Sequence, residues 1–203
     1  MTVINMHRIT AMNATPSRKE QTHDRILKTA SRAIRRKGYG GIGVSDIMKE
    51  AGLTHGGFYA HFASKTELLA EVADTTGAES LARLGRIADR APEGESLAAI
   101  VDAYLSDKHV ESPETGCPVA ALGSELARQE DPVRRVATRR MKEVIDLIGR
   151  QLPGWAEGAD RAQALSTYCT LVGALTIARA VDDPALSRAV RDAARDLILA
   201  PRD

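Results

Sequence analysis

The segment from Val44 to Phe62 consists of two short helical patterns separated by a glycine-centred turn. In the first pattern, apolar residues recur at helical spacing, at Ile47, Met48 and Ala51. Gly52 follows, and glycine readily adopts the left-handed backbone conformation that a tight turn requires. Leu53 then supplies an apolar side chain for the angle between the helices. This layout is typical of a helix-turn-helix, whose second helix binds in a groove of DNA. An ordinary helical hairpin gives the same short pattern.

The flanks of this segment favour the helix-turn-helix. The stretch Gly-Phe-Tyr-Ala-His-Phe-Ala-Ser-Lys-Thr-Glu-Leu-Leu, from Gly57 to Leu69, resembles the signature of the TetR/AcrR family of transcriptional regulators. In that family, Tyr-x-His-Phe closes the recognition helix and a lysine opens the next one. Residues 25–30 and Gly38-Tyr39 resemble the first helix of the family and its exit, so the motif match covers residues 21 to 70. The resemblance implies an all-α fold, with an N-terminal three-helix helix-turn-helix DNA-binding domain and a C-terminal helical ligand-binding and dimerisation domain.

Charge is distributed unevenly along the chain. Residues 1–65 hold 11 Lys and Arg against 4 Asp and Glu, whereas residues 66–203 hold 17 against 23, and the whole chain has a net charge of only +1. A basic face is often no more than a solvated surface. Beside the motif, it indicates that the N-terminal third faces a polyanion.

Composition and helix signals agree with a helical protein. Hydrophobic residues make up 43% of the chain and aromatic residues 3%, which suits packed helices rich in Ala and Leu. Residues 1–16 are expected to form a disordered tail, residues 17–64 the DNA-binding domain and residues 65–203 the effector-binding and dimerisation domain. Ser45 and Thr54 are plausible N-caps for the two helices of the motif. Helices are predicted over 17–37, from 64 toward 90, and over 96–110, 118–128, 132–151, 160–181 and 184–199.

Several classes of protein and site are not expected. Because no long uncharged apolar run occurs and the first 16 residues lack the apolar core of a signal peptide, the protein is expected to be cytoplasmic, with no membrane partner. Cys117 and Cys169 lie far apart, so they indicate neither a disulfide framework nor metal ligands. His55 and His61 are six residues apart, a spacing that does not place them on one face of a helix, so they are not expected to bind a metal ion together. We expect no metal, no cofactor and no catalytic residues.

The resemblance implies the residues that contact double-stranded DNA. Phosphates are assigned to Tyr59, His61 and Lys65, with hydroxyl donors at Ser45 and Thr54. Base edges are assigned to Thr54, His55, Gly57 and Ala60, and Gly56 permits close approach of the backbone. Adjacent glycines weaken a helix start by about 1 kcal/mol each relative to alanine, so we expect this helix to order fully only on DNA. Phe58 and Phe62 are expected in the core.

The last two predicted helices are expected to form an antiparallel hairpin. The resemblance implies that the hairpin pairs with its copy in a four-helix homodimer interface, and the small residues Gly173 and Ala174 permit close approach of helices. The residues assigned to dimerisation are Leu171, Leu175, Leu186, Val190 and Leu197. The alternative is that this hairpin belongs wholly to the core of one protomer.

The sequence says least about the effector, an unknown small molecule that the resemblance implies. The larger or polar-tipped candidates for its cavity are Tyr104, His109, Leu122, Met141 and Trp155, and the alternative for each is ordinary packing or surface exposure, which the sequence favours. In Gly116-Cys117-Pro118, proline at the first helical position makes Cys117 the N-cap, where helix amides stabilise a thiolate. With His109 close, Cys117 is a candidate sensor of an oxidant or electrophile; the alternative is a small buried residue in a tight corner.

Three classes of function remain. The leading hypothesis is a homodimeric repressor that binds a palindromic operator and is released by a small-molecule effector or by modification of Cys117. The second is a structural or chromosome-organising protein with the same fold, whose binding to DNA does not depend on a ligand. The third is an enzyme with Cys117 as nucleophile and His109 as base, which we do not expect because no third group orients them.

Overall fold

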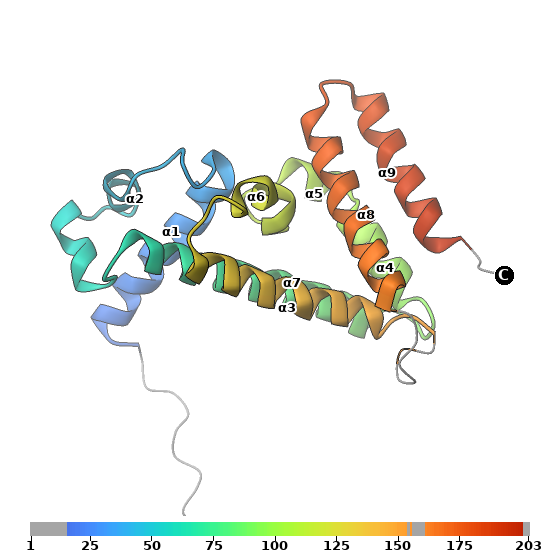
Figure 1. The fold of residues 1–203 in the computed structure, drawn as a ribbon, viewed down its shortest axis with the longest axis horizontal. Coiled ribbons are helices and arrows are strands. Elements are labelled where there is room, and N and C mark those ends of the chain that lie inside the picture. Colours follow the sequence, from blue (N-terminus) through green and yellow to red (C-terminus); the bar gives the residue numbers. More distant parts are fainter. Residues whose placement is uncertain (1–15, 154, 156–160, 201–203) are drawn as a thin grey trace, which may run out of the picture.

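The computed structural model describes residues 16–153, 155 and 161–200, and within these ranges the chain is helical, without a strand (Figure 1). Except for Pro16, the predicted N-terminal tail lies outside the described residues. Within the described part, no helix is long and apolar enough to cross a membrane. The helices are α1 (Arg18–Lys37), α2 (Val44–Glu50), the short 3₁₀ helix η1 (His55–Ala60), α3 (Lys65–Arg90), α4 (Ser96–Tyr104), α5 (Asp107–Glu111), α6 (Pro118–Leu126), α7 (Asp131–Gly149), α8 (Arg161–Ala180) and α9 (Pro184–Leu199).

Helix α1 begins and ends where its sequence predicts. Ser17 is the N-cap: its Oγ accepts a hydrogen bond from the Glu20 N–H at 3.2 Å, and the Glu20 carboxylate accepts one from the Ser17 N–H at 2.7 Å. This capping box satisfies two backbone donors that a helix start leaves free. Gly38 ends the helix with φ +82°, in the region that favours glycine.

The helix-turn-helix differs from its prediction at the start of its first helix. Helix α2 begins at Val44 after Gly43, so the expectation that Ser45 is the N-cap is wrong. The Asp46 carboxylate accepts the Gly43 N–H at 3.2 Å and takes the capping role. Thr54 is the N-cap of η1, as predicted, but its side chain makes no cap hydrogen bond. In the structure, the second helix of the motif is a short 3₁₀ helix, which agrees with the weak helix propensity of the adjacent glycines.

Helix α3 connects two hydrophobic cores. Its first half packs against α1, α2 and η1, in a cluster that includes Ile26, Ile34, Phe58, Phe62 and Leu68. Its second half belongs to a cluster formed with the later helices, which includes Leu84, Ile100, Ile148, Leu171 and Leu175. Leu122 of α6 and Val133 of α7 also lie in the first cluster, so later helices contribute to the core of the DNA-reading part.

The C-terminal helices largely follow the apolar pattern, with one break. The helix predicted over 96–110 is wrong as a single element, because α4 ends at Tyr104 and α5 begins at Asp107. Ser106 separates them: its Oγ accepts the His109 N–H at 3.3 Å and caps α5. Helices α3 and α7 lie side by side, and α8 and α9 form a hairpin at one end of the molecule (Figure 1). Asp183 caps α9 by accepting the N–H groups of Ala185 and Leu186.

Candidate functional site

The recognition segment, residues 54–61, exposes most of the residues assigned to DNA. Thr54, His55, Gly56, Tyr59 and Ala60 are exposed, and 67% of the Tyr59 surface is accessible. The ring of His55 meets the edge of Tyr59 at a centroid distance of 6.3 Å. The side chains that anchor the segment point inward, because Phe58 and Phe62 are buried and stack at 5.5 Å, as expected. The segment thus presents a polar and aromatic surface on a rigid apolar base. Of the remaining assigned residues, Ser45 is exposed and Gly57 is half-buried above Met48.

Lys65 is engaged within the protein. Its Nζ donates hydrogen bonds to the carbonyl oxygens of Tyr39, at 3.4 Å, and Ile42, at 3.2 Å. These bonds tie the loop between α1 and α2 to the start of α3. Lys65, which the resemblance assigns to a phosphate, thus already has acceptors for two of its three N–H donors.

His61 closes the recognition segment as a neutral ring. Burial lowers its pKa, and the nearby charges of His23 and Lys19 lower it further. Its buried Nδ1 has no hydrogen-bond partner among the described residues. His23 stacks on Phe62 at 4.5 Å and contacts the Glu71 carboxylate through Nε2 at 2.8 Å. At neutral pH, His61 therefore offers a hydrogen bond rather than a positive charge.

Helix α1 adds a basic surface that the motif does not include. Its exposed cations, which form no ion pair within the described residues, are Arg18, Lys19, Arg25, Lys28 and Arg32. Residues 18, 25, 28 and 32 follow one helical face, and this spacing is the signal by which sequence reasoning can find these four. Such a face supplies nonspecific attraction for phosphates.

A second candidate site is a small pocket among α3, α6 and α7, with a cavity volume of about 30 Å³. Of the residues proposed for an effector, Tyr104, Cys117 and Met141 line it. The sequence analysis missed the polar lining residues Tyr39, Ser80, Arg140 and Tyr168. Burial raises the pKa of Tyr39 to about 12, with the Glu125 carboxylate contributing.

Two candidate effector residues lie elsewhere. Leu122 faces the first core rather than the pocket, because α6 packs against the N-terminal helices as well as α8. Trp155 packs its ring against Gly149 at the end of α7, away from the pocket lining. Both are packing residues, the alternative left open in the sequence analysis.

His109 is buried behind the pocket wall, and both ring nitrogens are used. Nδ1 lies 2.6 Å from the Tyr104 carbonyl oxygen, which only accepts, so Nδ1 carries the proton. Nε2 accepts the backbone N–H of Cys117 at 2.9 Å. Burial, together with the charges of Arg83 and Arg179, lowers the pKa of His109 to about 4. The available lone pair of His109 therefore binds the backbone and not the Cys117 thiol, so this geometry does not support the enzyme hypothesis in which His109 is the base.

Cys117 occupies the corner predicted for it. It is buried at the N-cap of α6, with Pro118 at the first position. Beside it, the hydroxyl of Tyr104 is buried without a hydrogen-bond partner among the described residues. Burial raises the pKa of Tyr104 well above its usual value, and the neighbouring Cys117 raises it further. The pocket wall thus includes the thiol of Cys117 and, beside it, the Tyr104 hydroxyl, which has no hydrogen-bond partner among the described residues.

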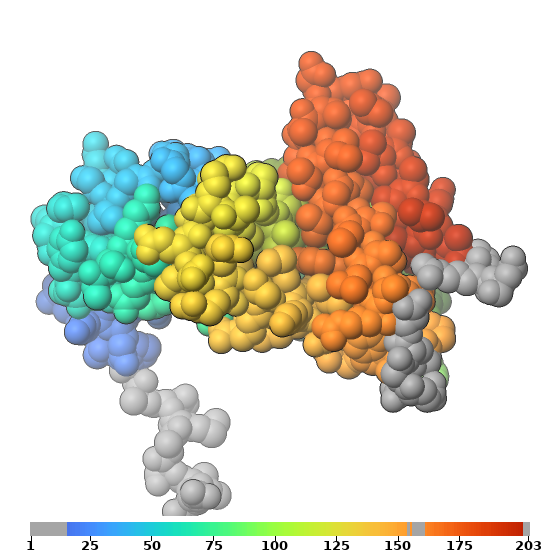
Figure 2. Space-filling view, viewed as in Figure 1, coloured from blue at the N-terminus to red at the C-terminus, as the bar shows by residue number. Residues whose placement is uncertain are grey.

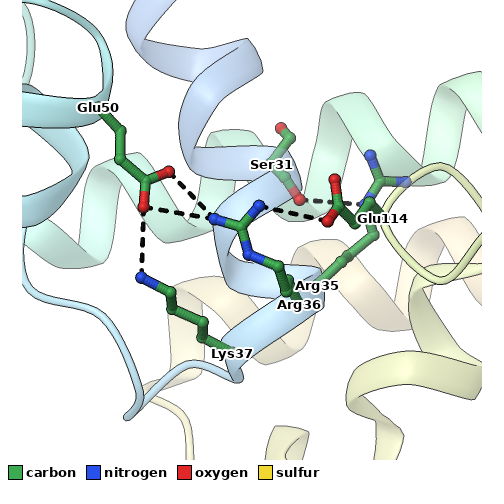
Figure 3. A network of polar contacts seen from close by, with 6 residues as sticks. All are labelled: Ser31, Arg35, Arg36, Lys37, Glu50 and Glu114. Atoms are coloured by element: carbon green, nitrogen blue, oxygen red, sulfur yellow. Dashed lines mark hydrogen bonds and ion pairs between the residues drawn. The ribbon is translucent and has the colours of Figure 1, made fainter.

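A polar network connects this corner to the helix-turn-helix (Figure 3). Arg35 is buried in α1, and its Nη1 donates to the carbonyl oxygen of Gly116 at 3.2 Å. Next to it, Arg36 bridges Glu114 at 3.2 Å and Glu50 of α2 at 3.3 Å. The turn before Cys117 therefore contacts α1 directly and α2 through one arginine.

The hairpin of α8 and α9, which Figure 2 shows projecting from the body of the molecule, carries exposed apolar side chains. Of the residues assigned to dimerisation, Leu171 and Leu175 are 0% exposed, so they fill the protomer core and offer no surface to a partner. Leu186 and Leu197 are 48% and 66% exposed, and Val190 is half-buried. Sequence reasoning missed the exposed apolar residues of α8, Leu165 and Ile177.

Comparisons with known proteins match the helix-turn-helix and then most of the chain. Residues 26–72 match the family described as bacterial regulatory proteins, tetR family. An HTH-type transcriptional regulator of Lactococcus lactis is 30% identical over 134 residues, which cover 64% of this chain and 68% of the relative. An HTH-type transcriptional regulator of Mycobacterium tuberculosis (strain H37Rv) is 28% identical over 187 residues, which cover 87% of this chain and 94% of the relative.

Solved structures share the fold. A TetR-family transcriptional regulator from Cytophaga hutchinsonii has a TM-score of 0.78 at 21% identity, covering 91% of this chain and 96% of that structure. FadR of Bacillus subtilis, solved in complex with stearoyl-CoA, has a TM-score of 0.70 at 19% identity, covering 89% and 100%. These relatives are regulators rather than enzymes. With a matching motif, a relative that it largely covers and a shared two-part helical fold, this chain belongs to the TetR family of bacterial transcriptional regulators.

Proposed function

We propose that this regulator is a homodimeric repressor that binds a palindromic operator and leaves it when a small molecule occupies the pocket among α3, α6 and α7. The observation that carries this proposal is the hydrogen bond from Arg35 of α1 to the carbonyl oxygen of Gly116, one residue before pocket-lining Cys117. It provides a short physical connection between a cavity and the DNA-reading helices. Repression controlled by an effector is also typical of the family.

The DNA-bound state requires two recognition segments at a fixed spacing. A single short helix makes few contacts, whereas two segments related by a dyad read half-sites about 34 to 36 Å apart. The exposed residues Leu165, Ile177, Leu186 and Leu197 give the α8–α9 hairpin an apolar face for the partner copy. Operator symmetry then follows from the symmetry of the protein.

Release follows if the ligand favours a different position of the Glu114–Cys117 turn. A ligand changes a conformational equilibrium only by its differential affinity for the two states. A ligand that displaces Cys117 or Tyr104 also moves Gly116, whose carbonyl binds Arg35. Moving α1 relative to α3 changes the separation of the two recognition segments, because both helices belong to the core that supports Phe58.

Modification of Cys117 is a second way to trigger the same movement. Its side chain lines the pocket, and addition of the thiol to an electrophilic carbon places a bulky group at the start of α6. Cys169 is exposed and provides the matched control. In Cys169→Ser protein, N-ethylmaleimide should abolish operator binding. In Cys117→Ser protein, the same treatment should modify Cys169 and leave operator binding intact.

The experiment that tests the proposal is selection of DNA fragments bound by the purified full-length protein, from random and genomic pools. Enrichment of one palindrome supports an operator-specific dimer. Diffuse enrichment without a palindrome contradicts the proposal and favours a structural DNA-binding role. If a palindrome is found but maleimide has no effect on Cys169→Ser protein, the thiol trigger is wrong and a reversible ligand remains.

A further inference from the structure

His109 holds Tyr104 and Cys117 next to each other. Its Nδ1 donates to the Tyr104 carbonyl oxygen at 2.6 Å, and the two rings meet nearly at right angles, with 4.8 Å between their centroids. Its Nε2 accepts the backbone N–H of Cys117 at 2.9 Å. Arg179 of α8 donates to the carbonyl oxygen of His109 at 2.5 Å, so the histidine is itself held in place. One buried ring therefore sets the positions of both residues.

The hydroxyl of Tyr104 is a hydrogen-bond donor that has no acceptor. It is buried without a partner among the described residues, and Tyr104 as a whole is only 1% exposed. A buried hydroxyl of this kind loses its hydrogen bonds to water without compensation, and such groups are rare in folded proteins. Tyr104 and Cys117 both line the small pocket among α3, α6 and α7. An unsatisfied donor and a thiol thus face the same cavity.

The cavity limits what can occupy it. Its volume is about 30 Å³, and one water molecule needs about 10–15 Å³ of such space. Because bonded atoms lie closer together than separate waters, the cavity suits a molecule of about three or four heavy atoms. Arg140 lines the cavity, but it forms ion pairs with Asp74 and Glu143, both at 2.7 Å, so its charge is already neutralised. Most of the remaining wall is apolar and includes Ala73, Val119, Ala137, Met141 and Val144.

We propose that Cys117 and Tyr104 form a modification site for a small α,β-unsaturated carbonyl compound, with the Tyr104 hydroxyl bound to the carbonyl oxygen and the Cys117 sulfur adding to the β-carbon. This inference rests on the proposed thiol trigger and names the chemical class that acts on it. Hydrogen peroxide also has a suitable size, but its two O–H groups need acceptors, of which a mostly apolar wall supplies few. The carbonyl compound has only an acceptor, which the unpartnered hydroxyl satisfies.

The addition balances without an oxidant or a further reactant. The carbon–sulfur bond forms as the electrons of the carbon–carbon double bond shift toward the carbonyl oxygen. That oxygen takes the hydroxyl proton of Tyr104, the thiol proton passes to the tyrosine oxygen, and the resulting enol returns to the carbonyl form. No separate base is required, which agrees with the use of the His109 lone pair by the backbone. Because burial raises the pKa of Tyr104, its hydroxyl holds the proton before the reaction.

The test measures how fast acrolein modifies the two cysteines of the full-length protein at pH 7.5, by mass spectrometry of the peptides that contain them. Cys169 is exposed and serves as the internal reference. An exposed thiol ordinarily reacts faster than a buried one. We expect the opposite, with Cys117 modified at least ten times faster than Cys169. Equal rates, or faster modification of Cys169, would overturn the inference.

A second reagent and one variant test the hydroxyl. Tyr104→Phe removes no hydrogen bond that the described residues provide, so it should keep the Tm of the wild type. Its ratio of acrolein rates, Cys117 over Cys169, should fall about tenfold through the lost bond to the carbonyl oxygen. Methyl iodide alkylates thiols but offers no oxygen to a donor, so its ratio should favour Cys169 in both proteins. If the variant does not fold, a wild-type preference of both reagents for Cys117 contradicts the carbonyl site.

Tyr39→Phe is the matched control. Tyr39 also lines the pocket, but its backbone N–H binds the Glu125 carboxylate near the opposite end of α6 from Cys117. The acrolein ratio should therefore stay at the wild-type value. An equal fall in Tyr39→Phe and Tyr104→Phe would show a general effect of the pocket wall and contradict the assigned donor.

Operator release, measured on the selected palindrome with Cys169→Ser protein, separates this inference from the proposed function. If acrolein modifies Cys117 with the help of Tyr104 but the modified protein stays on DNA, the site stands and the thiol trigger is wrong. If N-ethylmaleimide releases DNA while acrolein shows no preference for Cys117, the trigger stands and the carbonyl site is wrong.

Discussion

Acidification should destabilise the protein through His109. The pKa of this ring is lowered from 6.5 to about 4, mainly by burial, so the unfolded chain takes up the proton at a higher pH than the folded protein. Its contribution to stability is therefore fully present above pH 6.5 and is lost as the pH falls toward 4. The difference between the two pKa values corresponds to about 3 kcal/mol of unfolding free energy. The geometry agrees, because a second ring proton would meet the N–H of Cys117 instead of donating to an acceptor.

The assay is urea denaturation of wild-type protein and His109→Gln at several pH values between 7.5 and 4. Glutamine retains an amide for one of the two hydrogen bonds but has no proton to gain in this range. The advantage of the wild type over the variant should shrink by about 3 kcal/mol as the pH falls. Parallel curves for wild type and His109→Gln would refute the reasoning.

Three further predictions concern packing, DNA contact and assembly. Gly77→Ala should lower the unfolding free energy by about 1–3 kcal/mol, because the added Cβ would lie 2.6 Å from Arg140 Cβ. Gly85 lies in open space on the same helix, so Gly85→Ala should raise the unfolding free energy by about 1 kcal/mol. Thermal denaturation compares the two variants. Tyr59→Phe should weaken binding to every DNA sequence about tenfold, through one lost bond to phosphate, without changing Tm; anisotropy titrations that show changed sequence preference instead would contradict this role. Leu197→Glu should convert the dimer to monomers in sedimentation experiments, because it charges an exposed apolar face, and an intact dimer would place the interface elsewhere.

Local signals explain which helix ends could be predicted. The capping box at Ser17 and the positive φ of Gly38 and Gly52 depend on residues within a few positions, so the sequence contains the needed information. The break between α4 and α5 is also local, but the apolar spacing continues through Ser106 and hides its capping role. Gly43 precedes α2 because the Asp46 side chain, rather than the better-known N-cap residue Ser45, accepts the free backbone donor.

Long-range contacts explain what could not be predicted at the candidate sites. Nothing near Lys65 in the sequence indicates that its ammonium binds the carbonyl groups of Tyr39 and Ile42. The Gly-Cys-Pro corner was predictable from proline chemistry, whereas the bond from His109 Nε2 to the backbone depends on how α5 packs. Arg35 of α1 and Arg179 of α8 both reach that corner, so their proximity exists only in the folded chain.

The two later residues in the first core, Leu122 and Val133, bear on how such regulators can be recombined. They belong to the same apolar cluster as Phe58 and Phe62, although they come from α6 and α7. A chimaera that joins the first 64 residues to the remainder of a distant relative would bring foreign side chains into this cluster and weaken the support of the recognition segment. Operator preference in this chain is therefore better redirected by exchanging the exposed side chains of residues 54–60 than by transplanting the N-terminal helices as a unit.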